Sequence, residues 1–196
     1  AATDIEKGEL IFVDKPVIKL AVDTEFNFVD PDFMTSLKEQ IESLPSEARA
    51  QYYKLTTRDG NTYQVHLSKS DLEVLDMFVD NSKEVFLELN SRYSVLYLNM
   101  ALVNHSCSPN ATNTGVKLGK TDSDEDGNTE LRAIKNICKG EEINICYFEG
   151  VQHYSSIPRK RKTALKRHMG FDCKCPVCMG QVPLQEKTLK KLIELH

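Results

Sequence analysis

Residues 104–110 read NHSCSPN and place an amide, an imidazole, a hydroxyl and a thiol in consecutive positions. The amide of Asn104 can donate and accept hydrogen bonds, and the thiolate of Cys107 can bind a metal ion. The turn Ser-Pro-Asn that follows is rigid and would hold these side chains in place. The next dense group of cysteines, CKCPVC at 173–178, lies far downstream. The segment therefore predicts a site that joins the middle of the chain to a distant part of it.

The composition indicates a globular protein with one main domain. The chain has 196 residues, 40% of them hydrophobic, which is enough for one core with a large insertion or a small appendage. Its net charge of −4 provides no overall basic field for nucleic acid, so direct nucleic-acid binding is not expected. No run approaches the roughly 18–20 apolar residues of a membrane span, and AATDIEKGEL lacks a leader pattern. We expect a soluble protein of the nucleus and/or cytoplasm, and a fragment of a longer chain because it starts without methionine.

The first half of the chain changes from β to helical character. Residues 4–20 predict two strands with a turn, because the run LIFV follows Gly8 and ends at Asp14-Lys15-Pro16. From about residue 24 to 95 the pattern is helical, with one helix ending at Pro45 and SEARAQYYKL following it. A capping box at Ser70–Glu73 predicts the start of a third helix, DLEVLDMFVDNSKEVFLELN.

The second half returns to β character before it ends in helices. ELRAI and INICYF, separated by a turn at Gly140, predict a hairpin or two neighbouring strands. TDSDEDG at 121–127 predicts an acidic loop, PRKRKTALKRHMGF a basic helix, and QEKTLKKLIELH the start of an amphipathic helix. The fold class is therefore α+β, mainly β, with a helical block inserted.

The cluster C-x-C-x-x-C formed by Cys173, Cys175 and Cys178 predicts a zinc site. Structural zinc takes four ligands, so one is missing locally. The candidates are His168 and Cys107, and we favour Cys107 because its rigid turn would pin residues 104–110 against the C-terminal segment. The alternative for Cys107 is a small buried hydrophobic residue. Two further cysteines, Cys138 and Cys146, are interpreted as core.

Three motifs in order, NHSCSPN, KGEEINICYF at 139–148 and GFDCKCPVC at 170–178, resemble the SET-domain protein-lysine methyltransferases with a post-SET zinc site. The similarity is greatest to the SMYD type or its fungal relatives, although this chain has no MYND finger. The resemblance implies a β-clip fold with knot-like C-terminal threading, made of 1–23 and 96–150. It also implies a helical insert at 24–95, a post-SET zinc segment at 151–180 and the start of a C-terminal helix at 181–196.

The same resemblance implies S-adenosylmethionine as methyl donor and a lysine side chain of a protein, such as a histone tail, as acceptor. Asn104 and His105 would hold the donor, Phe171 would stack near its adenine, and Tyr147 would be the active-site tyrosine in contact with it. The zinc ligands would be Cys107, Cys173, Cys175 and Cys178. Tyr147 need not be the base, and the side chain of His105 is interpreted as structural.

Several alternatives stay open. Many relatives have a tyrosine at the position of Met169, an aromatic residue at Ile145 and a Gly-x-Gly before the position of Ala1, so a catalytically silent SET-like interaction module is the second hypothesis. A zinc nucleic-acid module is the third, disfavoured by net charge and by the absence of paired finger motifs. The stretch PRKRKTALKR is either a solvated helix face or a patch for nuclear targeting or an acidic partner.

The neighbouring carboxylates Glu141 and Glu142 do not form a catalytic pair in this interpretation. In a strand they would point to opposite faces and could not act on one bond. We expect Glu142 to brace the segment that carries Tyr147.

Overall fold

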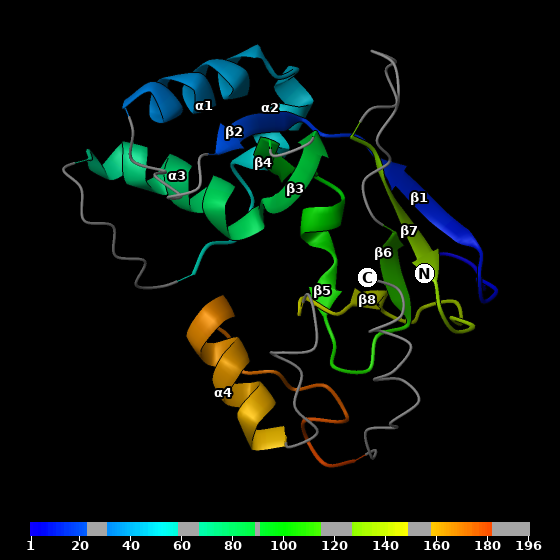
Figure 1. The fold of residues 1–196 in the computed structure, drawn as a ribbon. Coiled ribbons are helices and arrows are strands. Elements are labelled where there is room, and N and C mark those ends of the chain that lie inside the picture. The colour runs from blue at the N-terminus through cyan, green and yellow to red at the C-terminus, as the bar shows by residue number, and fades with distance from the viewer. Residues whose placement is uncertain (23–30, 59–66, 89–90, 115–126, 149–157, 182–196) are drawn as a thin grey trace. The chain divides into compact units, whose positions relative to one another are not determined.

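The structure of the protein is a computed structural model that describes residues 1–22, 31–58, 67–88, 91–114, 127–148 and 158–181 (Figure 1). The predicted acidic loop, apart from Gly127, and the predicted helix at 185–196 lie outside these residues. The chain forms two compact units. Within the described residues, one unit contains 14–22, 31–58, 67–88, 91–102 and 127–128, and the other contains 1–13, 103–114, 129–148 and 158–181.

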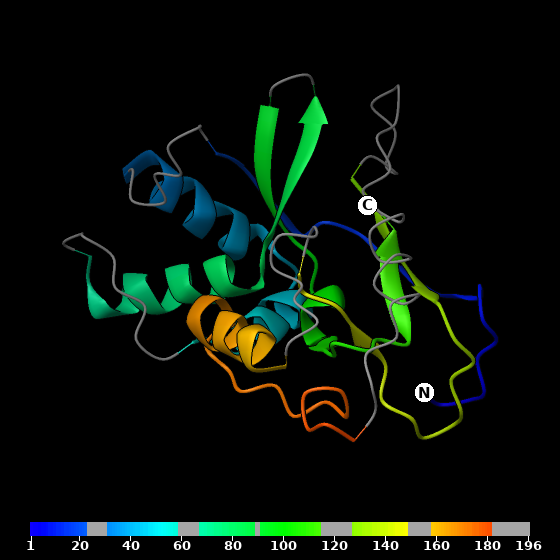
Figure 2. The same cartoon turned by 60° about the horizontal axis from the view of Figure 1, so that its bottom comes forward.

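The first of these units is a three-stranded antiparallel sheet with three helices. Its strand order is β2 (Ile18–Val22), β4 (Ser91–Leu96), β3 (Lys83–Glu88). The helices α1 (Pro31–Ser43), α2 (Ser46–Tyr52) and α3 (Lys69–Asn81) pack with this sheet (Figures 1 and 2). Their shared core consists of Ile18, Leu20, Phe33, Met34, Leu37, Ile41, Leu44, Tyr52, Leu55, Leu75, Phe78, Leu96 and Leu98.

The end of α3 differs from the prediction. The sequence pattern extends the helix through Phe86 and Leu89, but α3 ends at Asn81 and residues 83–88 form β3. Ser82 is extended and its N–H bonds to the Phe78 carbonyl at 2.8 Å, which closes the helix. The run Val85-Phe86 suits a strand because β-branched and aromatic residues favour extended structure, and pairing with β4 outweighs the helical spacing.

The start of α3 also differs from the prediction, because the N-cap lies two residues earlier. The predicted box opens at Ser70, whereas the N-cap is Ser68, whose hydroxyl accepts from the N–H of Asp71 at 3.1 Å. Both serines can cap a helix, and the contact with Asp71 decides between them.

A buried carboxylate fixes the end of this unit just before the segment quoted above. Asp14 is 4% exposed and accepts from the side chain of Asn99 at 3.0 Å and from the N–H of Met100 at 2.8 Å. Met100 begins the short 3-10 helix η1 (Met100–Leu102). The carboxylate therefore satisfies the Met100 N–H, which a short helix leaves without a partner, and also binds the Asn99 side chain.

The other unit contains the predicted site. A three-stranded sheet has the order β1 (Leu10–Asp14), β7 (Thr129–Ala133), β6 (Ala111–Thr114). A two-residue strand, β5 (Asn104–His105), pairs in parallel with β8 (Asn144–Ile145). The basic helix α4 (Pro158–Met169) follows as predicted and ends at Gly170, whose φ of +77° favours glycine.

Two predicted strand pairings are wrong. β1 and β2 do not form a pair, because β1 belongs to the sheet with β7, where the Gly8 N–H bonds to the Ala133 carbonyl at 2.8 Å. β7 and β8 do not form a hairpin either, because β8 pairs with β5. Both strands find partners distant in sequence, which short-range turn signals cannot reveal.

The architecture confirms the predicted α+β class, with small sheets and a helical block. The described helices include none that is long and apolar enough to cross a membrane. The predicted divisions at residues 23, 95 and 150 stay predictions, since the compact units describe packing and not function.

The core of the helical unit gives a direct stability test. Leu75 lies on α3 and is fully buried against the other core residues. Leu75→Ala should therefore reduce the free energy of unfolding by about 2–5 kcal/mol. Glu73→Ala, on the exposed side of the same helix, should change it by less than about 0.5 kcal/mol. Urea denaturation followed by circular dichroism measures both; equal midpoints would contradict this packing.

Candidate functional site

Four cysteine thiols meet in the second unit. The sulfur atoms of Cys107, Cys173, Cys175 and Cys178 all lie within 4.8 Å of one another, and those of Cys107 and Cys178 are 3.4 Å apart. A zinc–sulfur distance of about 2.3 Å gives tetrahedral sulfur–sulfur edges of about 3.8 Å. The separations fit a four-sulfur metal site, and all six cysteines are free of disulfides. Cys107 is a member of this cluster, and His168, exposed in the last turn of α4, is not.

The electrostatics of the cluster suit a bound cation. Burial, followed by the contact with Cys178 and the charges of the other thiols, raises the pKa of Cys107 well above its usual range. Burial raises the pKa of Cys173 to about 11. Burial also raises the pKa of Cys175, but hydrogen bonds from backbone groups more than offset this and bring it to about 7. A metal ion ionises coordinating thiols outright. A bound cation would therefore offset the electrostatic repulsion between the four thiolates.

The cysteine loop is folded onto itself. The N–H of Met179 bonds to the carbonyl of Cys175 at 3.0 Å, and that of Gln181 bonds to the carbonyl of Pro176 at 2.9 Å. Gly180 has a φ of +72°, a conformation that favours glycine. The loop buries a small apolar cluster formed by Cys107, Phe148, Leu165, Cys173, Val177 and Cys178. The local hydrogen bonds therefore present the three downstream thiols on one side of the loop.

The imidazole of His105 connects this cluster to the predicted active-site tyrosine. Its Nδ1 accepts from the backbone N–H of Tyr147 at 2.9 Å, and its Nε2 lies 3.4 Å from the Cys107 sulfur. Burial, followed by the charge of Arg161, lowers the pKa of His105 to about 4. The ring is thus neutral at pH 7, and because Nδ1 accepts, the proton is assigned to Nε2, facing sulfur. This agrees with a structural role for the His105 side chain.

Tyr147 is held at both its backbone and its hydroxyl. The hydroxyl donates to the carbonyl oxygen of Val103 at 2.6 Å. Burial, followed by the charge of Glu142, raises the pKa of Tyr147, so the phenol keeps its proton at neutral pH. A protonated phenol can donate a hydrogen bond but cannot serve as a general base.

Three aromatic rings surround His105. Its centroid lies 5.3 Å from that of Tyr147, 5.7 Å from that of Phe148 and 5.9 Å from that of Phe171. Phe171 and Tyr147 meet edge to face at 6.2 Å. Phe171 is half-buried two residues before Cys173, so the cysteine loop brings it to Tyr147. The structure thus gathers Phe171 with His105 and Tyr147.

Asn104 is exposed, and its side-chain amide donates to a Glu142 carboxylate oxygen at 2.7 Å. An amide has two N–H groups and one acceptor oxygen, so this contact leaves capacity for a ligand. Glu141 has different partners, the side chain of Asn110 at 3.0 Å and the N–H of Cys138 at 3.1 Å. The two carboxylates therefore have separate side-chain partners, but the predicted reason is wrong, because both residues precede β8 and do not lie within a strand.

Asn110 is a structural residue that the sequence reasoning missed. It is 7% exposed, and its amide donates to Glu141 and to the Glu142 carbonyl while accepting from the Asn144 N–H at 2.9 Å. These bonds hold the end of NHSCSPN against the segment before β8. Its position after Pro109, where a polar side chain closes a turn, was the available signal.

The interpretation of Cys138 as core is wrong. Cys138 is exposed, because the neighbouring Ile137 is the residue that faces inward and pairs with Ile5. Cys146 is half-buried beside the thiol cluster, and burial raises its pKa to about 11.

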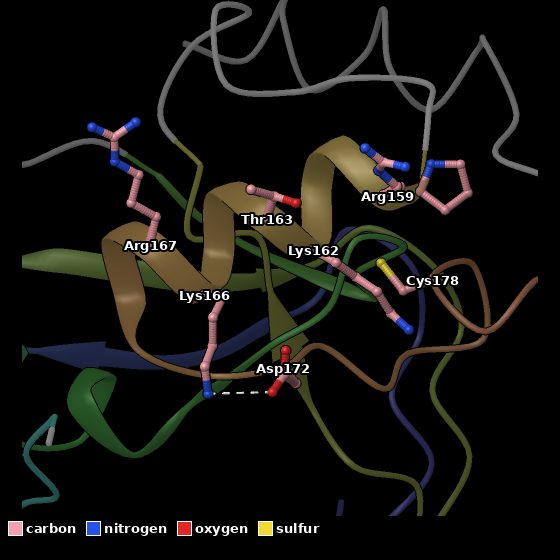
Figure 3. A pocket seen from close by; sticks show the side chains of 8 residues that line it. Arg159, Lys162, Thr163, Lys166, Arg167, Asp172 and Cys178 are labelled. Atoms are coloured by element: carbon pink, nitrogen blue, oxygen red, sulfur yellow. Dashed lines mark ion pairs between the residues drawn. The ribbon is translucent and has the colours of Figure 1, made fainter.

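A basic groove of about 580 Å³ runs beside α4 (Figure 3). Its lining includes Arg159, Lys162, Lys166 and Arg167, with Asp172 on the facing loop, 3.3 Å from the Lys166 amine. None of the predicted cofactor-contacting residues lines it. Basic residues of PRKRKTALKR therefore do form an exposed face in the described part of the chain.

Comparison with known proteins assigns the family. The SET-domain family model matches residues 1–148. The chain belongs to the SET-domain family. The histone-lysine N-methyltransferase ATXR2 of Arabidopsis thaliana is 38% identical over 77 residues, which is 39% of this chain and 14% of that protein. The protein-lysine N-trimethyltransferase SMYD5 of Gallus gallus is 34% identical over 114 residues, 56% of this chain and 25% of that protein.

A third similar protein covers the whole SET-domain chain described here. The histone-lysine N-methyltransferase set5 of Schizosaccharomyces pombe is 24% identical over 197 residues, 100% of this chain and 50% of that protein. The chain therefore spans at most half the length of these three relatives. The solved Neurospora SET-domain protein DIM-5 aligns over 80% of this chain and 50% of its own at 15% identity, with a TM-score of 0.32, too low to add to the assignment.

Removal of the central thiol tests the metal site. Cys107→Ser should lose most of the metal that purifies with the chain, because the site would keep only three thiolates. His168→Ala should retain the wild-type content, since His168 is outside the cluster. Metal per chain is measured by plasma mass spectrometry without chelators in the buffers. Full retention in Cys107→Ser together with loss in His168→Ala would reverse the assignment.

Proposed function

We propose that this SET-domain chain is the catalytic part of a protein-lysine methyltransferase that uses S-adenosylmethionine. The observation that carries the proposal is the double attachment of residues 104–107. His105 bonds to the Tyr147 backbone, while Cys107 joins the thiol cluster two residues later. Relatives named as histone-lysine and protein-lysine methyltransferases support a protein lysine as the acceptor, on a histone or another protein.

We infer that the metal is zinc in a structural role. Four sulfur donors in tetrahedral spacing favour zinc or an iron–sulfur cluster, and zinc needs all four protein ligands when its role is structural. The donor set Cys107, Cys173, Cys175 and Cys178 fills that requirement. Zinc bound there would hold Phe171 beside Tyr147, because Cys173 follows Phe171 so closely in the chain.

The proposed donor site consists of Asn104, His105, Tyr147 and Phe171. When bound, S-adenosylmethionine supplies a sulfonium-activated methyl group. Asn104 would grip the polar amino-acid tail with its amide, and the half-buried ring of Phe171 would offer a stacking surface. His105 would contribute backbone groups, since its ring nitrogens already face Tyr147 and Cys107.

Tyr147 would align the acceptor amine and need not remove its proton. A lysine amine has a pKa of about 10.4 in water, and an apolar aromatic surrounding lowers it by disfavouring the charged form. The ring of Tyr147 would form one wall of that surrounding. Its hydroxyl donates a hydrogen bond to the Val103 carbonyl, which would fix the direction of the ring. Alignment of this kind can supply up to about 7–11 kcal/mol of barrier reduction.

Binding and turnover together test the proposal. Calorimetry with S-adenosylmethionine on the full-length protein should show binding, and Tyr147→Phe should lower methyl transfer to protein lysine by up to about 100-fold, because the ring loses its anchor to Val103. Tyr53→Phe, an exposed tyrosine in α2's C-cap, is the matched control and should be unchanged. Absence of binding heat and of turnover would favour the silent interaction module.

A further inference from the structure

Arg161 is buried inside the unit that holds the thiol cluster. It is 0% exposed, and no other lysine or arginine of the described ranges is classed as buried. Arg161 and Leu165 are four residues apart on α4, and both are fully buried, so they define the inward face of that helix. The basic groove residues Arg159, Lys166 and Arg167 are exposed. Arg161 is therefore buried, whereas neighbouring basic residues of the same helix face solvent.

A buried guanidinium needs a negative partner. Arginine keeps its charge in proteins, and an uncompensated buried charge is strongly destabilising. The Nη2 atom of Arg161 lies 4.0 Å from the sulfur of Cys178. The same guanidinium also contacts the side chain of Cys107. Sulfur atoms of the cluster are therefore among the groups that face its charge.

The thiol cluster has the complementary problem. Four thiolates around a divalent zinc ion leave a net charge of minus two in a largely buried site. Hydrogen bonds from neighbouring groups to the coordinating atoms commonly offset such charge. His105 directs only one ring nitrogen toward Cys107, 3.4 Å from its sulfur. The positive charge of Arg161 would reduce this net charge from minus two to minus one.

We propose that Arg161 is the built-in counter-charge of the metal centre, binding the sulfurs of Cys107 and Cys178 and slowing the loss of metal from it. The inference rests on the zinc centre of the proposed function. Arginine suits this role better than lysine because its planar fork can direct N–H groups at two sulfurs at once. By joining α4 to Cys107, it makes the helix part of the site and not only a neighbour of it. Arg161 is thus a positioning residue.

The experiment measures zinc retention in four proteins: wild type, Arg161→Met, Arg161→Lys and Arg159→Met. Methionine keeps an apolar chain without charge, lysine keeps the charge without the fork, and Arg159 is an exposed arginine of the same helix. Zinc transfer to a chromogenic chelator should be about 10–100-fold faster in Arg161→Met than in wild type. Arg161→Lys should fall between the two, and Arg159→Met should match wild type.

A spectroscopic measurement separates charge compensation from packing. In the cobalt-substituted proteins, loss of the guanidinium should move the thiolate-to-cobalt charge-transfer bands of Arg161→Met to lower energy, because the sulfurs become more electron-rich. Arg161→Lys should restore part of the shift. Equal bands and equal zinc release in folded wild type and Arg161→Met would overturn the inference while leaving the zinc centre intact.

The other outcomes are equally distinct. A wild-type protein that purifies without metal and binds none when zinc is added would overturn both the zinc centre and the role of Arg161. If Arg161→Met does not fold, Arg161→Gln against Arg161→Lys decides, because glutamine keeps an N–H donor without charge. Faster zinc release from the glutamine variant supports the counter-charge, and equal release in the two overturns it.

Discussion

The imidazole of His105 is the constraint on which the site depends. One ring nitrogen accepts from the Tyr147 backbone, and the other faces the Cys107 sulfur. The contact with the Tyr147 N–H requires an Nδ1 without a proton, which a charged ring would not offer, and burial keeps the ring neutral. A single neutral side chain thus ties the segment with the tyrosine to the segment with the thiol. The parallel pairing of β5 with β8 repeats this connection in the backbone.

Much of this site could be predicted from sequence because its signals are local. The spacing of Cys173, Cys175 and Cys178 indicates a metal loop by itself, and Pro45 and Gly170 mark helix ends that the structure contains. The rigid turn after Cys107 linked that residue to the loop, and the resemblance to SET-domain proteins then added Tyr147. The structure brings these residues together. Where functional side chains are closely spaced in the sequence, local chain geometry already places them near one another.

The parts that the sequence did not predict depend on distant partners. The run Val85-Phe86 continues a helical spacing, and only pairing with β4 makes it a strand. β1 lies beside β7, far along the chain, and β8 lies beside β5, which turn residues cannot specify. Arg161 was hidden in a run of similar charges, since composition does not tell which basic residue faces inward. Burial, and not residue type, distinguishes it.

The spacing of the four thiols has a consequence for how the chain matures. Three of them lie close together in the C-terminal loop, whereas Cys107 is 71 positions from Cys178. The ribosome synthesises the NHSCSPN segment before the C-terminal loop. Cys107 can therefore contact the three other thiols only after the loop has been made. Closing so long a loop has an entropic cost that grows only slowly with length, and the loop can collect an ion with three sulfurs before that closure. Binding of the proposed ion by all four thiols would therefore have to come after synthesis of the C-terminal loop.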